Sequence, residues 1–152
     1  MDELLKSMAA KDILVEINLT SNDVILGIKG AGHPLPTYLE YGVPVTLATD
    51  DEGVSRIDLT HEYQRAVTTY DLSYQQLLYF ARNSLQYSFL PGASLFSTTL
   101  SATVVDACAA TSVGSREIDK GCADFLAASP KATLQWELET RLSRFAARFF
   151  QP

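Results

Sequence analysis

Two adjacent carboxylates, Asp50 and Asp51, are the residues of this sequence best suited to chemistry. They directly follow the apolar run 43–48, which predicts a buried strand, and neighbouring carboxylates at the tip of such a strand repel each other. A cation would stabilise both anions, and a single aspartate is a competent zinc ligand beside histidine nitrogens. The second carboxylate would then accept hydrogen bonds from a substrate. The alternative is an acidic turn that caps the next helix, since aspartate is a common turn and N-cap residue.

Other titratable residues give weaker signals. The two histidines, His33 and His61, lack the H-x-H or H-x-x-x-H spacing of a metal site, so we expect solvated or locally hydrogen-bonded side chains. Glu16 lies inside a hydrophobic run, where a carboxylate is costly unless it is paired. It either supports the site or is salt-bridged within the sheet, and we favour the structural role.

Nucleophilic and phosphate-binding motifs are not supported by the sequence. No G-x-S-x-G surrounds the candidate serines, which are Ser21, Ser84 and Ser88. The glycines of the loop after residue 26 fit neither G-x-G-x-x-G nor a lysine-ended P-loop.

The elements that must position the carboxylates form a strand–helix–strand unit. Strands are predicted over 13–17, buried on both faces, and over 43–48, with a short helix over 35–41 between them. Such units give parallel strands, and sites in parallel α/β folds lie in the loops at the carboxyl ends of the strands. The polar segments 18–22, expected to be a turn, and 49–53 therefore lie where a site is expected.

The rest of the chain is predicted to be mostly helical. Ser73 and Gln76 form a capping box, and Ser129-Pro130 is an N-cap followed by a first-turn proline. Helices are predicted over 2–10, over 59–70, from the capping box to Pro91-Gly92, over 115–128, and from Pro130 onward. Residues 92–114 carry no clear pattern.

Charge and composition narrow the class of partner. The chain has 152 residues and a net charge of −6, with 5 basic and 12 acidic residues in 1–74. An acidic front half does not suit nucleic acid, and no apolar run approaches the roughly 20 residues of a membrane helix. Cys108 and Cys122 do not form a CxxC motif, so a disulfide and two buried thiols both remain open.

Several blocks, taken together, resemble the C-terminal part of the adenosine deaminase family. They occur in the family's order over about residues 1–92: EINLTSN at 16–22, HPL at 33–35, GVPV at 42–45, TDD at 49–51, EY at 62–63, ARNS at 81–84 and SFLP at 88–91. One block alone is a weak signal, whereas the ordered set is specific. Residues 93–152 resemble the family's C-terminal extensions only loosely.

The resemblance implies a fold and a reaction. The fold is the C-terminal portion of a TIM (β/α)8 barrel, with residues 13–17 and 43–48 as its last two parallel strands, followed by helices. The implied domains are 1–92, a segment of the barrel, and 93–152, a helical extension. The implied reaction is the zinc-dependent hydrolysis of adenosine to inosine and ammonia, in which zinc activates water for attack on the purine. Asp50 matches the family's zinc ligand and Asp51 matches its purine-binding aspartate.

The sequence departs from the family in two respects. Asn18-Leu19 stands where the family usually has Cys-Pro. The H-x-H zinc motif, the third zinc histidine, the catalytic glutamate and the histidine near the water have no counterpart in this sequence. We therefore expect a fragment of a zinc-dependent deaminase that is inactive alone and holds Zn²⁺ only in the full-length protein.

Alternatives remain open at this stage. The substrate of the parent enzyme is adenosine or another purine such as adenine or AMP. The alternative to an enzyme fragment is a non-catalytic binding module that dimerises through exposed strand edges. Cytoplasmic and exported locations are both compatible with the sequence.

Overall fold

Two short parallel strands lie at the centre of the N-terminal part of the chain. The computed structural model describes residues 2–98, 102–115 and 117–150. It divides the chain into two compact units, Met1–Ser84 and Leu85–Pro152, which we call the N-terminal and C-terminal units. This division concerns compactness and does not test the expected boundary at residue 92. Among the described residues, no helix is both long and apolar enough to cross a membrane.

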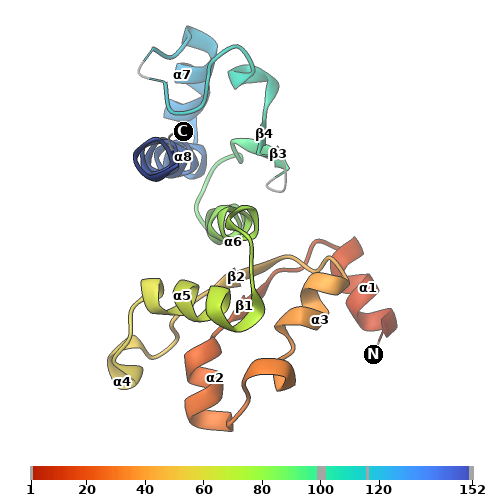
Figure 1. The fold of residues 1–152 in the computed structure, drawn as a ribbon. Helices are drawn as coiled ribbons and strands as arrows, with labels where there is room; N and C mark the ends of the chain where they lie inside the picture. The colour runs from red at the N-terminus through yellow and green to blue at the C-terminus, as the bar shows by residue number, and fades with distance from the viewer. Residues whose placement is uncertain (1, 99–101, 116, 151–152) are drawn as a thin grey trace. The chain divides into compact units, whose positions relative to one another are not determined.

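In the N-terminal unit, strand β1 pairs in parallel with β2, with Val15 opposite Val45 and Ile17 opposite Leu47. Helices gather around this pair (Figure 1). The elements in chain order are α1 (Asp2–Ala10), β1 (Val15–Ile17), α2 (Leu19–Leu26), the 3₁₀ turn η1 (Gly30–Gly32), α3 (Leu35–Glu40), β2 (Val45–Leu47), α4 (Glu52–Ser55), α5 (Leu59–Tyr70) and α6 (Tyr74–Gln86). The parallel pair and its crossover agree with a piece of an α/β barrel, although two strands do not themselves make a barrel.

Burial explains why this unit folds around β2. All three residues of β2 are buried, and α6 is tied to the strand by two hydrogen bonds. Asn83 Nδ2 donates to the Val45 carbonyl at 2.8 Å, and Thr46 Oγ1 donates to the Phe80 carbonyl at 3.1 Å. The core consists of buried apolar side chains from strands and helices: Ile17, Leu19, Leu35, Val45, Leu47, Ala66, Leu72 and Phe80.

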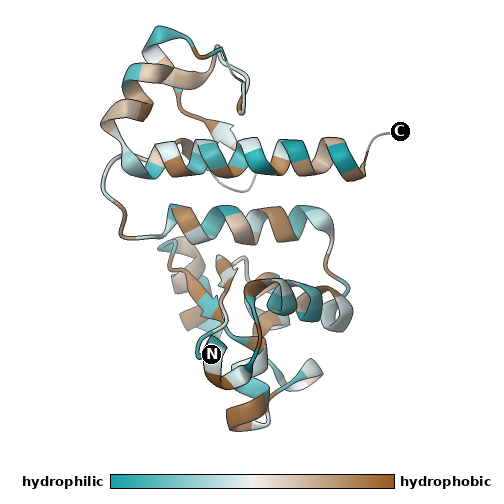
Figure 2. Cartoon of the chain, turned by 90° about the vertical axis from the view of Figure 1, so that its left-hand side faces the viewer, coloured by the Kyte–Doolittle hydropathy of each residue, from teal (hydrophilic) through white to brown (hydrophobic). Residues whose placement is uncertain are grey.

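The C-terminal unit is built from a small antiparallel ladder and two helices. Its elements are β3 (Phe96–Thr98), β4 (Thr103–Val104), the 3₁₀ turn η2 (Asp106–Cys108), α7 (Lys120–Ala128) and α8 (Pro130–Phe149). Ser129 caps α8 by accepting from the backbone N–H of Ala132, as the sequence predicts. Helix α8 carries hydrophilic and hydrophobic residues along its whole length (Figure 2).

Several predicted elements are confirmed and others are corrected, among them the helix from the capping box, which ends at Gln86 and not at Pro91-Gly92. The helix over 59–70 and the capping box of Ser73 with Gln76 are present as predicted. The expected turn over 18–22 is wrong, because helix α2 begins at Leu19. The predicted helix over 115–128 begins only at Lys120, where Asp119 accepts from Cys122 N.

A further correction concerns β1, which is not buried on both faces. Glu16 is exposed, and its carboxylate forms no ion pair within the part of the chain that the structure describes, so the salt bridge within the sheet is not found. The physical reason is that no described element covers the face of β1 that carries Glu16, so this side chain stays in contact with solvent.

Candidate functional site at the carboxyl ends of the strands

Asp50 lies in the turn after β2, where its backbone adopts a left-handed conformation with φ of +55°. Aspartate tolerates this conformation better than most residues because its short side chain can bond locally. The hydroxyl of Ser21, in the first turn of α2, donates to Asp50 Oδ2 at 2.7 Å. Since α2 follows β1 directly, this bond joins the segments at the carboxyl ends of both strands.

Asp51 occupies the N-cap position of α4, but its side chain makes no capping hydrogen bond. Ser55 N donates to the Asp51 carbonyl at 2.9 Å, which is the first intrahelical hydrogen bond of α4. The carboxylate is exposed. Asp51 therefore stands at the N-cap position that the acidic-turn interpretation predicts, but its carboxylate does not cap the helix.

A buried carboxylate from α5 anchors the first turn of α2. Both oxygens of Glu62, which is fully buried, lie 3.2 and 3.3 Å from the Thr20 backbone nitrogen. Arg65 lies one turn further along α5 and donates to Thr20 Oγ1 at 3.2 Å. It also pairs with Asp23 at 2.5 Å. This hydrogen bond holds the pKa of the Asp23 carboxyl below its usual range.

His33 lies near Glu62 and Arg65, and its ring nitrogens are engaged in local contacts and not placed to bind a metal ion. Its Nδ1 accepts from the Leu35 backbone N–H at 3.1 Å, and the side-chain amide of Asn22 lies 2.9 Å from Nε2. The Asn22 atom at this distance is the amide nitrogen Nδ2, and a ring that accepts at Nδ1 is neutral. The ring is only 3% exposed, and burial lowers its pKa. Of the two expectations for His33, local hydrogen bonding is confirmed and solvation is wrong.

Asn18, at the junction of β1 and α2, holds an unsatisfied polar atom. Its Oδ1 is buried and has no hydrogen-bond partner in the part of the chain described. Asn18 stands at the N-cap position of α2, yet its side chain does not cap that helix. The Thr20 N–H that an N-cap oxygen would accept is instead bound by Glu62.

The structure brings together more residues than sequence reasoning placed at the site. It joins Asp50 to Ser21, whose hydroxyl donates to the Asp50 carboxylate. Sequence reasoning gave no role to Glu62, Arg65 or Asn18. Glu62 and Arg65 are three residues apart, and this spacing, which places both on one face of a helix, could have pointed to them. His61 is exposed on α5, outside this network.

The residues present do not fit a zinc ion by themselves. No group of three or more histidine, cysteine, aspartate or glutamate side chains that could hold a metal occurs within residues 2–98, 102–115 and 117–150. Asp50 offers one carboxylate, whereas a catalytic zinc site needs three protein ligands. Any zinc bound through Asp50 must therefore take its other ligands from residues beyond those described.

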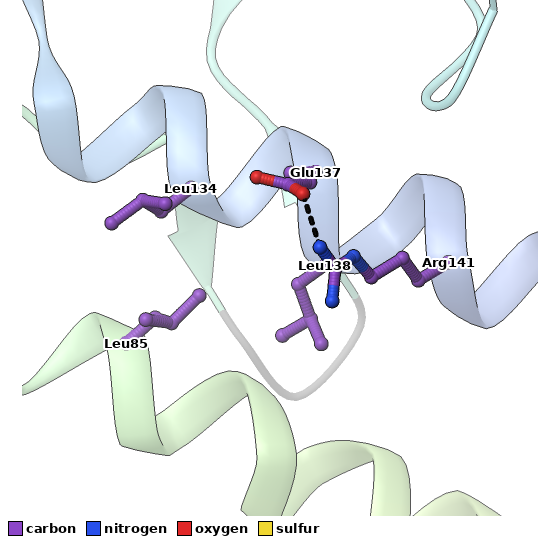
Figure 3. Close-up of a pocket in the computed structure, with 5 residues that line it drawn as sticks. All are labelled: Leu85, Leu134, Glu137, Leu138 and Arg141. Carbon is purple, nitrogen blue, oxygen red and sulfur yellow. Dashed lines mark hydrogen bonds and ion pairs between the residues drawn. The ribbon is translucent and has the colours of Figure 1, made fainter.

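A pocket elsewhere in the chain does not have the character of an active site. It encloses about 210 Å³ in the C-terminal unit and is lined by Leu85, Leu134, Leu138 and the ion pair of Glu137 with Arg141. Leu85 and Leu138 extend toward one another (Figure 3). The lining is apolar and its two charges neutralise each other, so it offers no group for catalysis.

Comparison with known proteins identifies a family. A sequence model described as adenosine deaminase matches residues 2–104. Relatives described as adenosine deaminase, from Escherichia coli strain SE11 and from Escherichia coli O139:H28, are each 38% identical to the chain over 88 residues. That stretch is 57% of this chain and 26% of each relative. The chain thus aligns with about a quarter of the length of these relatives.

Proposed function

The chain belongs to the adenosine deaminase family, and from this premise we propose that its N-terminal unit supplies one edge of a zinc-dependent purine deaminase site. In this proposal Asp50 is a zinc ligand and Asp51 binds the purine. The reaction is the hydrolysis of adenosine to inosine and ammonia. The hydrogen bond from Ser21 to Asp50 carries the proposal, because it fixes a carboxylate at the carboxyl ends of two parallel strands.

Each residue has a distinct part in this proposal. A zinc ion held in part by Asp50 would supply activation of water for the hydrolysis. Asp50 would contribute one anionic ligand, and Ser21 would orient it through a hydrogen bond to one of its oxygens. Asp51 would offer its exposed carboxylate to the purine ring. Glu62 would hold the first turn of α2, and with it Ser21, in place.

We propose that the chain alone is inactive, since one carboxylate cannot hold a catalytic zinc ion. A direct assay of adenosine conversion by the isolated chain, with and without added zinc, tests this. Robust turnover would show that the chain carries a complete site.

A chimera tests the roles of the two aspartates. The matched segment of the Escherichia coli adenosine deaminase is replaced by the corresponding residues of this chain, and zinc content and deamination are measured. We expect the chimera to be active. Asp50→Ala is expected to lower its zinc affinity by more than about 100-fold, which exceeds the effect typical of a residue that only supports a zinc ligand. Asp51→Asn is expected to keep zinc and to lose about 10- to 100-fold in kcat/KM.

Matched variants and substrates complete this experiment. Asp58→Ala, an N-cap aspartate on the neighbouring helix, is the control for general loss of stability. Retention of zinc by Asp50→Ala would overturn the ligand assignment. Adenine and AMP, tested beside adenosine, report whether the substrate is a different aminopurine.

A second candidate function rests on the open sheet. Within the described residues β1 and β2 pair only with each other, so each presents an unpaired edge. Consecutive residues of α2, which are Val24, Ile25 and Leu26, are also exposed. A non-catalytic module that associates through these surfaces would show a defined oligomer by light scattering and no effect of Asp50→Ala.

A further inference from the structure

The core of the C-terminal unit is small and contains a disulfide. Its buried members are Leu95, Phe96, Cys108, Cys122, Leu126, Ala132 and Trp136. Cys108 and Cys122 are bonded to each other and have no exposed surface. The disulfide is therefore part of the core itself, in contact with the apolar side chains that define it.

The disulfide joins η2 to α7, two elements that a loop separates along the chain. Cys108 ends η2 and Cys122 lies in the first turn of α7, 14 residues later. The described residues of the segment 109–119 form turns and bends without a helix or strand. Thr111 donates to Asp119, whose other oxygen accepts from Cys122 N at 3.1 Å. These hydrogen bonds are local to the same segment, so they shape the loop but leave its closure to the disulfide.

We propose that the Cys108–Cys122 disulfide is required for the folded state of the C-terminal unit, and that the chain therefore acquires its fold in an oxidising compartment. A bond that closes a loop of about 15 residues lowers the unfolding equilibrium constant by about 100-fold, mainly by restricting the unfolded chain. Disulfides persist in oxidising compartments and are reduced in the cytosol. This inference is independent of the proposed deaminase function.

Formation of the bond requires an oxidant of a defined class. The two thiols lose two protons and two electrons to an external disulfide by thiol–disulfide exchange. The attacking thiolate first forms a mixed disulfide with the oxidant, and the second cysteine then displaces it. The oxidant leaves as a dithiol, and the cysteine pair is left as the internal disulfide.

The chain contains a direct reporter for the test. Its single tryptophan, Trp136, is 8% exposed and packs in the same core as the disulfide. Tryptophan emission during urea unfolding therefore reports the C-terminal unit alone. We expect reduction with a phosphine reductant to raise the unfolding equilibrium constant of this unit by about 100-fold. If reduction leaves the unit unfolded even without urea, the emission maximum of Trp136 already lies at the wavelength of an exposed tryptophan at zero urea.

Two controls make the result decisive. The Cys108→Ala/Cys122→Ala double variant is expected to behave like the reduced wild type and to ignore the reductant. Backbone amide resonances of β1 and β2 in the N-terminal unit are expected to stay unchanged on reduction. An unchanged tryptophan transition in the reduced protein, or in the double variant, would overturn the proposal. So would two alkylatable thiols in folded protein prepared under oxidising conditions.

Discussion

At the scale of single residues, the Ser21–Asp50 hydrogen bond is the contact on which the candidate site depends. Its donor is buried and its acceptor is exposed, and they come from segments that follow different strands. We expect Ser21→Ala to lower the free energy of unfolding of the N-terminal unit by about 1 kcal/mol, since a side-chain hydrogen bond contributes about that much. The measurement is urea unfolding followed by backbone amide resonances.

The matched control for this prediction is Ser84→Ala. Ser84 is an exposed serine whose hydroxyl bonds only to the carbonyl of Ala81 in its own helix. Its removal is expected to change stability by less than about 0.5 kcal/mol, as for most surface substitutions. Equal effects of the two substitutions would show that the bond to Asp50 does not stabilise the unit.

His33 gives the N-terminal unit a pH dependence whose sign follows from burial. Desolvation lowers the pKa of the folded-state ring below about 6.5, the value of an unperturbed histidine. The unfolded chain then binds the proton more readily than the folded chain. Stability is therefore full above about pH 6.5 and is lost as pH falls toward the folded-state pKa.

We expect urea unfolding to show a lower free energy of unfolding at about pH 5 than at about pH 7.5. His33→Gln is expected to reduce this difference, and His61→Gln to leave it unchanged because His61 is exposed. The chain has no other histidines, so the two variants form a matched pair. A pH dependence that persists in His33→Gln would place its origin in other groups.

The residue scale also shows where sequence reasoning reached its limit. Adjacent aspartates after an apolar run were enough to place Asp50 and Asp51 at the carboxyl end of a strand, and the structure confirms that position. The hydrogen-bond partner of Asp50 was not predictable, because Ser21 is 29 residues away in the sequence and this separation does not indicate a contact. The contact of Glu62 with Thr20 was not predictable either, since it spans 42 residues.

At the scale of elements, helix α2 depends on tertiary contacts more than on its own sequence. The segment 18–22 has the polar composition of a turn, yet Leu19 is buried in the core and Glu62 accepts from Thr20 N. These two contacts override the local preference, as tertiary context often does. Helices α5 and α6 were predictable because their caps are local, as Asp58 and Ser73 illustrate.

We therefore expect Glu62→Ala to destabilise α2 and the loop that carries Ser21. The substitution leaves the Thr20 N–H buried without an acceptor, and we expect it to cost about 1–3 kcal/mol. Thermal unfolding measures the total loss, and hydrogen exchange of the Thr20 amide measures the local one. Glu52→Ala, at an exposed position in the first turn of α4, is the control. Unchanged exchange of the Thr20 amide in Glu62→Ala would contradict the anchoring role.

At the scale of the whole molecule, the open parallel pair is the main departure from an ordinary domain. Parallel strands normally lie inside larger sheets with both faces covered. Here the described strands have free outer edges, and residues Val24, Ile25 and Leu26 are each about two-thirds exposed. The family resemblance predicted neighbouring strands for this pair, whereas composition predicted only an ordinary globular chain of this length.

These surfaces lead to a prediction about association. We expect the chain at high micromolar concentration to form oligomers or aggregates, because contiguous exposed apolar residues and unpaired strand edges favour intermolecular contacts. Ile25→Lys is expected to lower the weight-average mass measured by light scattering, since a charge in the middle of the exposed segment opposes its burial. Phe89→Lys, which replaces an exposed apolar residue of the C-terminal unit, is expected to have little effect. A wild-type chain that stays monomeric at these concentrations would contradict the prediction, and equal effects of the two substitutions would show that association does not involve α2.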